Sequence, residues 1–195
     1  TIKESDGSEQ HLIVPYASVP VLQREGHLKY DLTMGRTRTN GSEGADENFL
    51  EATALYGLPH NITLYGGIES TLDNDVYRAI QIGSGLNLGD AGALSLDVTN
   101  AVSQLAKAGS EGSTSSTGQS WRIRYSKDIQ TTGTNFTVAG YRYSTQGYYS
   151  LQDVLNSYDD DDDNQQHEKD RTDVSVSQDI GYGAVSLSLY NEAYW

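Results

Sequence analysis

The clearest structural pattern in this chain is Leu94-Ser95-Leu96-Asp97-Val98-Thr99. Every second residue is apolar and branched, and each residue between is small or polar. Successive side chains of a β-strand point to opposite faces of the sheet, so this spacing predicts a strand with one apolar and one polar face. The turn-rich segment Asn87–Gly92 precedes the pattern and predicts a reversal into it from an earlier strand.

The same alternation recurs along most of the chain, whereas helical periodicity is weak. Segments rich in Gly, Asn and Asp separate the alternating runs, as they do in β-hairpins. A Gly/Ser/Thr-rich loop is predicted over Gly109–Gly118, and a short helix is predicted near Ser150–Leu155. Strands are predicted at about residues 28–34, 49–57, 62–69, 76–86, 94–99, 121–126, 134–145, 171–180 and 185–190.

The length of the predicted strands favours a membrane protein. We expect roughly nine strands of about 8–12 residues, close to the ~9–11 residues that cross a membrane and longer than the ~5–6 of a typical globular strand. The opposite face is small or polar, which fits a water-filled barrel interior. The predicted fold class is all-β: an antiparallel meander of long hairpin strands that forms part of a large transmembrane β-barrel. A soluble β-sandwich module that binds carbohydrate or acts as an adhesin is the alternative from a different class.

The composition excludes several functional classes. The chain has 195 residues, enough for one domain or for part of a larger one, and its formal net charge is −14. So acidic a chain repels phosphate backbones, and nucleic-acid binding is not expected. It contains no Cys, which excludes disulfides, thiol catalysis and Cys-ligated zinc. Thr1 lies within strand-like sequence and Trp195 ends in an aromatic pair, so we expect a fragment.

Catalytic and metal-binding motifs are not found. The four histidines, His11, His27, His60 and His167, have no second ligand at metal-binding spacing, and we expect them to be solvated at strand ends or in loops. The nucleophile elbow of hydrolases and the phosphate-binding loop of nucleotide hydrolases are both missing. We therefore predict no enzyme activity and no cofactor.

Asp159–Asp163 is the strongest acidic run. An EF-hand loop beginning at Asp159 would need Gly at its sixth position and Glu at its twelfth, where this chain has Asn164 and Asp170. We interpret the run as a solvated loop, with loose calcium binding as the alternative, and predict no metal site.

Two glycines interrupt the strand predicted around residues 76–86. In Ile82-Gly83-Ser84-Gly85 no third glycine or helix follows, so nucleotide binding is not indicated. Glycine within a strand instead indicates a bend or a close approach of another backbone.

Charged residues of the polar face form the first candidate site. Arg122 and Arg124 alternate with apolar and aromatic residues. If the apolar face meets lipid, both guanidiniums point into the barrel lumen, where charge is tolerated. There they line a polar channel, pair with nearby acids such as Asp97 or Glu69, or do both. We predict that Glu69, Asp97, Arg122 and Arg124 face the lumen.

The most specific resemblance to a known family lies in VPYASVPVLQREG at residues 14–26. This segment resembles the outer-membrane usher family of chaperone–usher fimbrial assembly. The resemblance extends over nearly the whole chain through shorter matches that occur in the family's order. These are Thr1–Gly7, Tyr56–Pro59, Thr63–Gly67, Tyr77–Ala79, Gly92–Thr99, Gly118–Ser120, Gly140–Tyr148 and Tyr194-Trp195.

The resemblance implies a domain organisation. Residues 1–14 correspond to the C-terminal hairpin of the plug domain, residues 15–26 to the plug-to-barrel connector, and residues 27–195 to strands of an incomplete transmembrane barrel. Arg24 and Glu25 then lie at the plug–barrel junction, where they either help to hold the gate or cap a turn.

The resemblance also implies transport rather than catalysis. Ushers are pores in the outer membrane of Gram-negative bacteria that assemble and secrete fimbrial subunits, which arrive as periplasmic chaperone–subunit complexes. The subunits join by exchange of strands, a form of β-augmentation. Nine strands are too few for the family's pore, and open sheet edges are costly in lipid, so we expect that the fragment alone does not transport. A general porin-type channel is the second reading within membranes.

Overall fold

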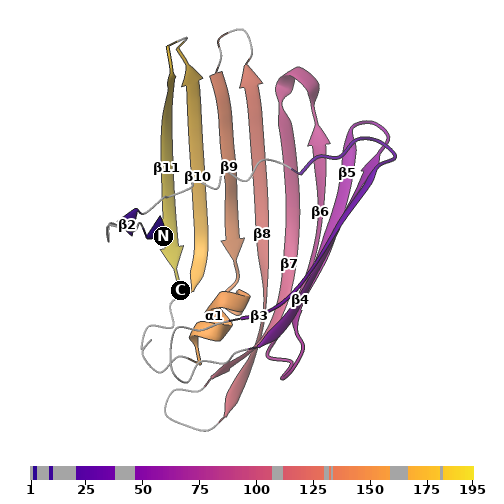
Figure 1. Cartoon of the computed structure of the whole chain (residues 1–195), viewed down its shortest axis with the longest axis vertical. Coiled ribbons are helices and arrows are strands. Elements are labelled where there is room, and N and C mark those ends of the chain that lie inside the picture. The colour runs from indigo at the N-terminus through magenta and orange to yellow at the C-terminus, as the bar shows by residue number, and fades with distance from the viewer. Residues whose placement is uncertain are drawn as a thin grey trace.

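The structure of this chain is a computed structural model that describes residues 2–3, 9–10, 21–37, 47–106, 112–129, 132, 134–158, 167–180 and 182–195. Its long strands form one antiparallel sheet of nine strands (Figure 1). They are β3 (Leu28–Arg36), β4 (Asn48–Leu58), β5 (Ile62–Thr71), β6 (Tyr77–Asn87), β7 (Ala93–Ala106), β8 (Ser113–Ile129), β9 (Thr134–Ser144), β10 (Glu168–Asp179) and β11 (Ala184–Tyr194). Near the N-terminus, β1 (Ile2–Lys3) pairs with β2 (Glu9–Gln10).

The sheet is a meander in which each strand pairs with its neighbours in the chain. Its strands run from 9 residues in β3 to 17 in β8, longer than those of typical globular sheets. The predicted antiparallel meander of long hairpin strands is confirmed. The β-sandwich alternative is wrong, because a sandwich needs two stacked sheets and the long strands that the structure describes form a single one.

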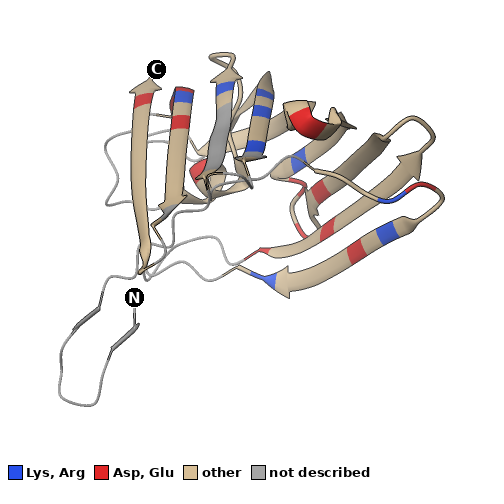
Figure 2. Cartoon of the chain, turned by 90° about the horizontal axis from the view of Figure 1, so that it is seen from above, with Lys and Arg blue, Asp and Glu red and all other residues tan. Residues whose placement is uncertain are grey.

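The two faces of the sheet differ in polarity, as the alternation predicts. Figure 2 shows the strands from above, where the sheet bends into an open arc. We call the face that packs against the helix α1 (Leu151–Asn156) the inner face, and its opposite the outer face. The inner face buries mostly small or charged side chains: Thr63, Thr71, Ser95, Asp97, Ser103, Ser120 and Arg124.

The outer face exposes large apolar side chains from one edge of the sheet to the other. On β3, Leu28, Tyr30, Leu32 and Met34 are all at least 60% exposed. Large apolar side chains are also exposed in the middle of the sheet and at its far edge: Ile80, Ile82, Leu96, Trp121, Ile123, Val185, Leu187 and Leu189. Water-soluble monomers rarely expose so large an apolar surface, whereas barrels in a membrane present one to lipid.

The beginning of β8 differs from the prediction. Residues 113–118 were expected to lie in a loop, but β8 begins at Ser113 and pairs with β7 from Ala106↔Ser113 to Ala101↔Gly118. A run of Ser and Thr reads as a loop by composition, yet these residues extend readily when a neighbouring strand supplies hydrogen bonds. Residues 109–111 lie outside the described part of the chain.

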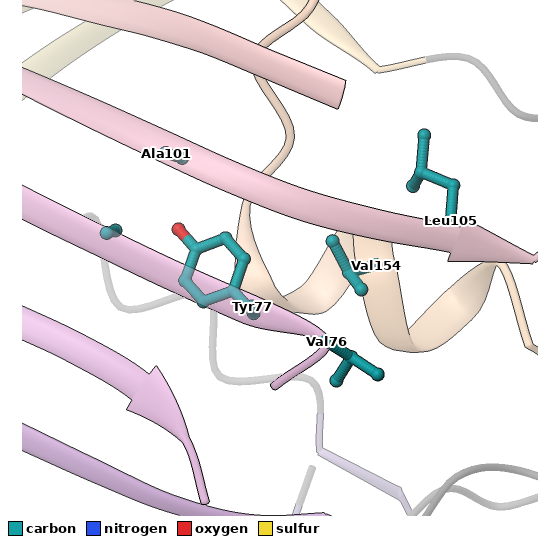
Figure 3. Close-up of a cluster of buried hydrophobic side chains, with 6 residues drawn as sticks. Val76, Tyr77, Ala101, Leu105 and Val154 are labelled. Carbon is teal, nitrogen blue, oxygen red and sulfur yellow. The ribbon is translucent and has the colours of Figure 1, made fainter. Parts of the chain in front are cut away.

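The helix α1 packs on the inner face, close to the predicted position. Ser150 caps its first turn: the Asp153 amide donates to Ser150 Oγ at 3.2 Å, and the Ser150 amide donates to the Asp153 carboxylate at 2.8 Å. Val154 then packs against Tyr77 and Leu105, which project from β6 and β7 (Figure 3). No helix among the described residues is both long and apolar enough to cross a membrane.

Candidate functional site

Asp97 on β7 is the centre of a buried polar cluster on the inner face. The carboxylate is almost inaccessible to solvent. It accepts hydrogen bonds from Arg124 Nη2 at 2.9 Å, from Arg122 Nε at 3.2 Å, from the Tyr65 hydroxyl at 2.9 Å and from Gln81 Nε2 at 2.8 Å. Four side chains from β5, β6 and β8 therefore converge on one acid, and we call this group the Asp97 cluster.

The register of the sheet explains how these side chains meet. Tyr65, Gly83, Asp97 and Arg122 are direct cross-strand neighbours on β5, β6, β7 and β8. A Cβ atom at Gly83 would lie 2.5 Å from Cζ of the Tyr65 ring and 2.6 Å from Cβ of Asp97. Because Gly83 has no side chain, the tyrosine ring crosses β6 and reaches the carboxylate. A close approach of another backbone was predicted for these glycines; at Gly83 side chains approach instead, and the backbone approach occurs at Gly85, where a Cβ would overlap the carbonyl oxygen of Val21.

The Asp97 cluster carries an excess of positive charge. One carboxylate lies between two guanidiniums, and Arg124 also donates to the Tyr65 hydroxyl at 3.1 Å. Charge-assisted hydrogen bonds of this kind are short and strong, and they hold the side chains in fixed positions. Pairing with nearby acids was one of the alternatives left open for Arg122 and Arg124, and the structure shows that both pair with Asp97. Neither arginine pairs with Glu69 in the described contacts.

A polar hollow lies beside the Asp97 cluster on the inner face. Glu51 on β4 and Glu69 on β5 are direct cross-strand neighbours at one side of it. Arg122 on β8 and Arg142 on β9 are direct neighbours at the other side. The hollow therefore has an acidic wall and a basic wall. Within each wall the two like charges lie opposite each other and repel.

Arg24 and Glu25 lie apart from the Asp97 cluster. Both side chains are exposed, and both residues belong to a segment that runs across the ends of β4, β5 and β6. Glu25 forms a parallel bridge with Gly57, and the His27 amide donates to the Arg24 carbonyl at 3.1 Å. The second contact closes a tight turn before β3.

His167 contradicts the expectation of solvated histidines. Its side chain is buried, its Nε2 lies 2.8 Å from the Gln146 carbonyl, and its ring centroid lies 4.1 Å from that of Tyr149. The residue precedes β10 and packs against the link that leads to α1, a contact between distant segments that local sequence does not reveal. His27 and His60 are exposed, as predicted, and His11 lies outside the described residues.

Four residues of the Asp97 cluster and the hollow were missed by sequence reasoning: Glu51, Tyr65, Gln81 and Arg142. Their alternation places them on the polar face, but a tyrosine or glutamine carries no chemical signature of a cluster. Within the described ranges, no group of three or more His, Cys, Asp or Glu side chains is placed to hold a metal ion. Asp159–Asp163 lies outside those ranges.

The fold and the site together define a class of protein. A curved antiparallel sheet of long strands, apolar outside and charged inside, is the wall of an outer-membrane β-barrel. The family model for outer membrane usher proteins matches residues 1–195, and the chain belongs to this family.

Curated relatives agree with this assignment. The chain is 42% identical over 216 residues to the outer membrane usher protein FimD of Salmonella typhimurium strain LT2, covering 100% of this chain and 24% of that protein. It is 45% identical over 157 residues to FimD of Escherichia coli strain K12, covering 80% of this chain and 17% of that protein. The chain thus spans about a quarter of the length of the first of these relatives.

Solved structures give the same result. The translocation pore of the P pilus usher PapC superposes with a TM-score of 0.74 and 30% identity, over 92% of this chain and 34% of that chain. PapC in a P pilus tip assembly intermediate with PapD, PapK and PapG superposes with a TM-score of 0.68 and 32% identity, over 99% of this chain and 23% of that chain. The predicted family, fold class and outer-membrane location are therefore confirmed.

Proposed function

We propose that this chain forms part of the wall of an usher pore that assembles and secretes fimbrial subunits delivered by a periplasmic chaperone. The observation that carries the proposal is the division of one continuous sheet into an exposed apolar outer face and a charged inner face. The usher in the P pilus tip assembly intermediate supports the same partners for the full-length protein. A porin-type channel would also be a barrel, but this chain belongs to the usher family.

The proposal assigns the two faces to two environments. Lipid covers the outer face, and the inner face bounds a water-filled lumen that Glu69, Asp97, Arg122 and Arg124 line. The Asp97 cluster supports a structural role there, because its charges are engaged with one another instead of being presented to a substrate. We infer transport rather than catalysis, with no nucleic-acid partner for so acidic a chain.

The domain boundaries follow from the same proposal. Residues 1–14 end the plug, residues 15–26 connect it to the barrel, and residues 27–195 supply barrel strands. The position of Arg24 and Glu25 immediately before β3 supports their assignment to the plug–barrel junction.

The lengths of the links between strands support an orientation in the membrane. By the strand bounds, the links at the end where β3 begins are all short (59–61, 88–92, 130–133 and 180–183). At the other end links 72–76 and 107–112 are also short, but links 37–47 and 145–167 are long. Outer-membrane barrels have short periplasmic turns and longer extracellular loops. We therefore place the connector at the periplasmic end.

A pair of substitutions at adjacent positions of β3 tests the proposed faces in the full-length protein. Leu32→Lys places a charge on the outer face, where lipid penalises it by about 2–4 kcal/mol near the membrane centre. Thr33→Lys places the same charge on the inner face and serves as the matched control. We expect only Leu32→Lys to lower the temperature at which the outer-membrane protein loses its compact form on electrophoresis. Equal effects of the two would contradict the assignment of the faces.

A further inference from the structure

The segment Val21–Glu25 crosses the inner face at the ends of β6, β5 and β4 (Figure 1). The segment and Gly26, which follows it, make three contacts with the sheet. The Gln23 amide donates to Thr63 Oγ1 at 2.8 Å, Glu25 bridges to Gly57, and the Gly26 amide donates to the Gly57 carbonyl at 2.8 Å. A backbone segment is thus hydrogen-bonded to the wall through two of the three strands that it crosses.

The positions beneath this segment form a row across the sheet. Gly57, Thr63 and Gly85 are direct cross-strand neighbours on β4, β5 and β6, and all three are buried on the inner face. A Cβ atom at Gly57 would overlap the carbonyl oxygen of Arg24, and one at Gly85 would overlap that of Val21. The row therefore leaves room for one backbone and for nothing larger.

The chemistry of the row suits this single purpose. Glycine inside a strand weakens it, because it loses more conformational freedom on folding and packs no side chain. Thr63 lies between the two glycines and supplies the polar contact: its hydroxyl accepts from the Gln23 amide and lies 3.4 Å from the Gln23 carbonyl. The two glycines lower the stability of their strands, but together with the Thr63 hydroxyl they allow a backbone to lie against the sheet and to form a hydrogen bond with it.

We propose that Gly57, Thr63 and Gly85 form a seat that positions Val21–Glu25 against the wall. The seat thereby fixes the point at which the polypeptide before Val21 enters the space enclosed by the barrel. The second statement rests on the proposed function, because it requires the inner face to bound a pore. The three residues are positioning residues: they act through the segment that they hold.

Trypsin cleavage after Arg24 in the folded full-length protein tests the seat directly. Cleavage requires the seated segment to open locally, and its rate follows the population of the open form. Gly85→Ala and Gly57→Ala should raise the rate at which a fragment beginning at Glu25 appears by about tenfold or more. Gly183→Ala is the matched control, because a Cβ there meets no atom within 4 Å, and its rate should not change.

Two conservative changes at Thr63 keep the test decisive if an alanine variant fails to fold. Thr63→Val preserves the volume and removes the hydroxyl, so it should speed cleavage after Arg24. Thr63→Ser restores the hydroxyl and should return the rate close to that of the unmodified protein. Compact migration on electrophoresis before heating confirms that each compared variant is folded.

Antibiotic leakage through cells that carry the same variants tests the consequence for the pore. Faster cleavage together with greater leakage supports the proposal in full. Faster cleavage with unchanged leakage overturns the role in positioning the preceding polypeptide, and unchanged cleavage in folded Gly85→Ala and Thr63→Val overturns the seat itself. A parent protein found outside the outer membrane would refute the proposed function, while the cleavage rates would still decide on the seat.

Discussion

At the scale of single residues, Asp97 is the centre of the buried polar cluster on the inner face. It is the shared acceptor for two guanidiniums, of which Arg124 is itself buried. Removing one partner of a buried ion pair is costly because the remaining charge loses its compensation. The loss of Asp97 leaves two cations and a tyrosine hydroxyl without their acceptor.

We expect Asp97→Ala to destabilise the full-length barrel by about 3–5 kcal/mol. The midpoint of urea unfolding measures this change. Arg78→Ala is the control, because its ion pair with Asp75 is exposed on both sides and contributes about 0–1 kcal/mol. If both variants shift the midpoint equally, the Asp97 cluster does not hold the strands together.

The sequence could predict which residues share a face but not which of them meet. Strict alternation put Glu69, Asp97, Arg122 and Arg124 on one face, and the cross-strand register does the same; that this face bounds a lumen stays a prediction. The choice between Asp97 and Glu69 as the partner acid depends on cross-strand register, which turn geometry sets and composition does not. Tyr65 was missed for a related reason: its reach depends on a glycine in another strand.

At the scale of elements, α1 is held by aromatic residues in the links on either side of it. Burial raises the pKa of the Tyr148 hydroxyl; the Arg142 guanidinium opposes this shift, while the Glu69 and Asp153 carboxylates add to it. Burial also raises the pKa values of Tyr149 and Tyr158, with nearby carboxylates adding to each shift. These hydroxyls are neutral in the packed state and resist ionisation there.

The sign of this shift predicts a loss of packing at high pH. A pKa that is higher in the folded state contributes stability that is complete below the unfolded value of about 10 and is lost as the pH rises through the folded value. Hydrogen exchange of residues 151–156 should therefore be constant from pH 7 to about 9, after correction for intrinsic rates, and accelerate above about 10. Tyr148→Phe should weaken that acceleration, and an unchanged profile in this variant would exclude Tyr148 as its source.

The elements themselves were largely predictable because alternation and helix capping are local signals. The start of β8 was not, since its Ser and Thr residues extend only because β7 lies beside them. The burial of His167 likewise depends on a contact with the link before α1.

At the scale of the whole molecule, the sheet is a wall with two edges. Among the described strands, β3 and β11 each pair on one side only. Unpaired backbone groups cost several kcal/mol each in hydrocarbon, so a wall in lipid must close on further strands. The chain's coverage of about a quarter of FimD agrees with this requirement.

We therefore expect residues 1–195 expressed alone not to restore fimbriae to cells that lack the full-length usher. Counting fimbriae by electron microscopy measures the outcome, with the full-length gene as the positive control. The isolated chain should sediment as an aggregate or a non-native assembly without detergent. A stable monomer in detergent-free buffer would contradict the lipid-facing role of the outer face.

Gly83 and Gly85 of β6 both face the inner side of the sheet, and a different group packs against each. Gly83 must admit an aromatic ring, and Gly85 must admit a main chain. Fluid lipid accommodates apolar side chains of different shapes, so other apolar residues can replace Ile80 and Ile82 with little loss of stability. Gly83 and Gly85 have no such freedom, because any side chain there would overlap its neighbour. Among related proteins, the outer-face residues of β6 should therefore vary much more than these two glycines.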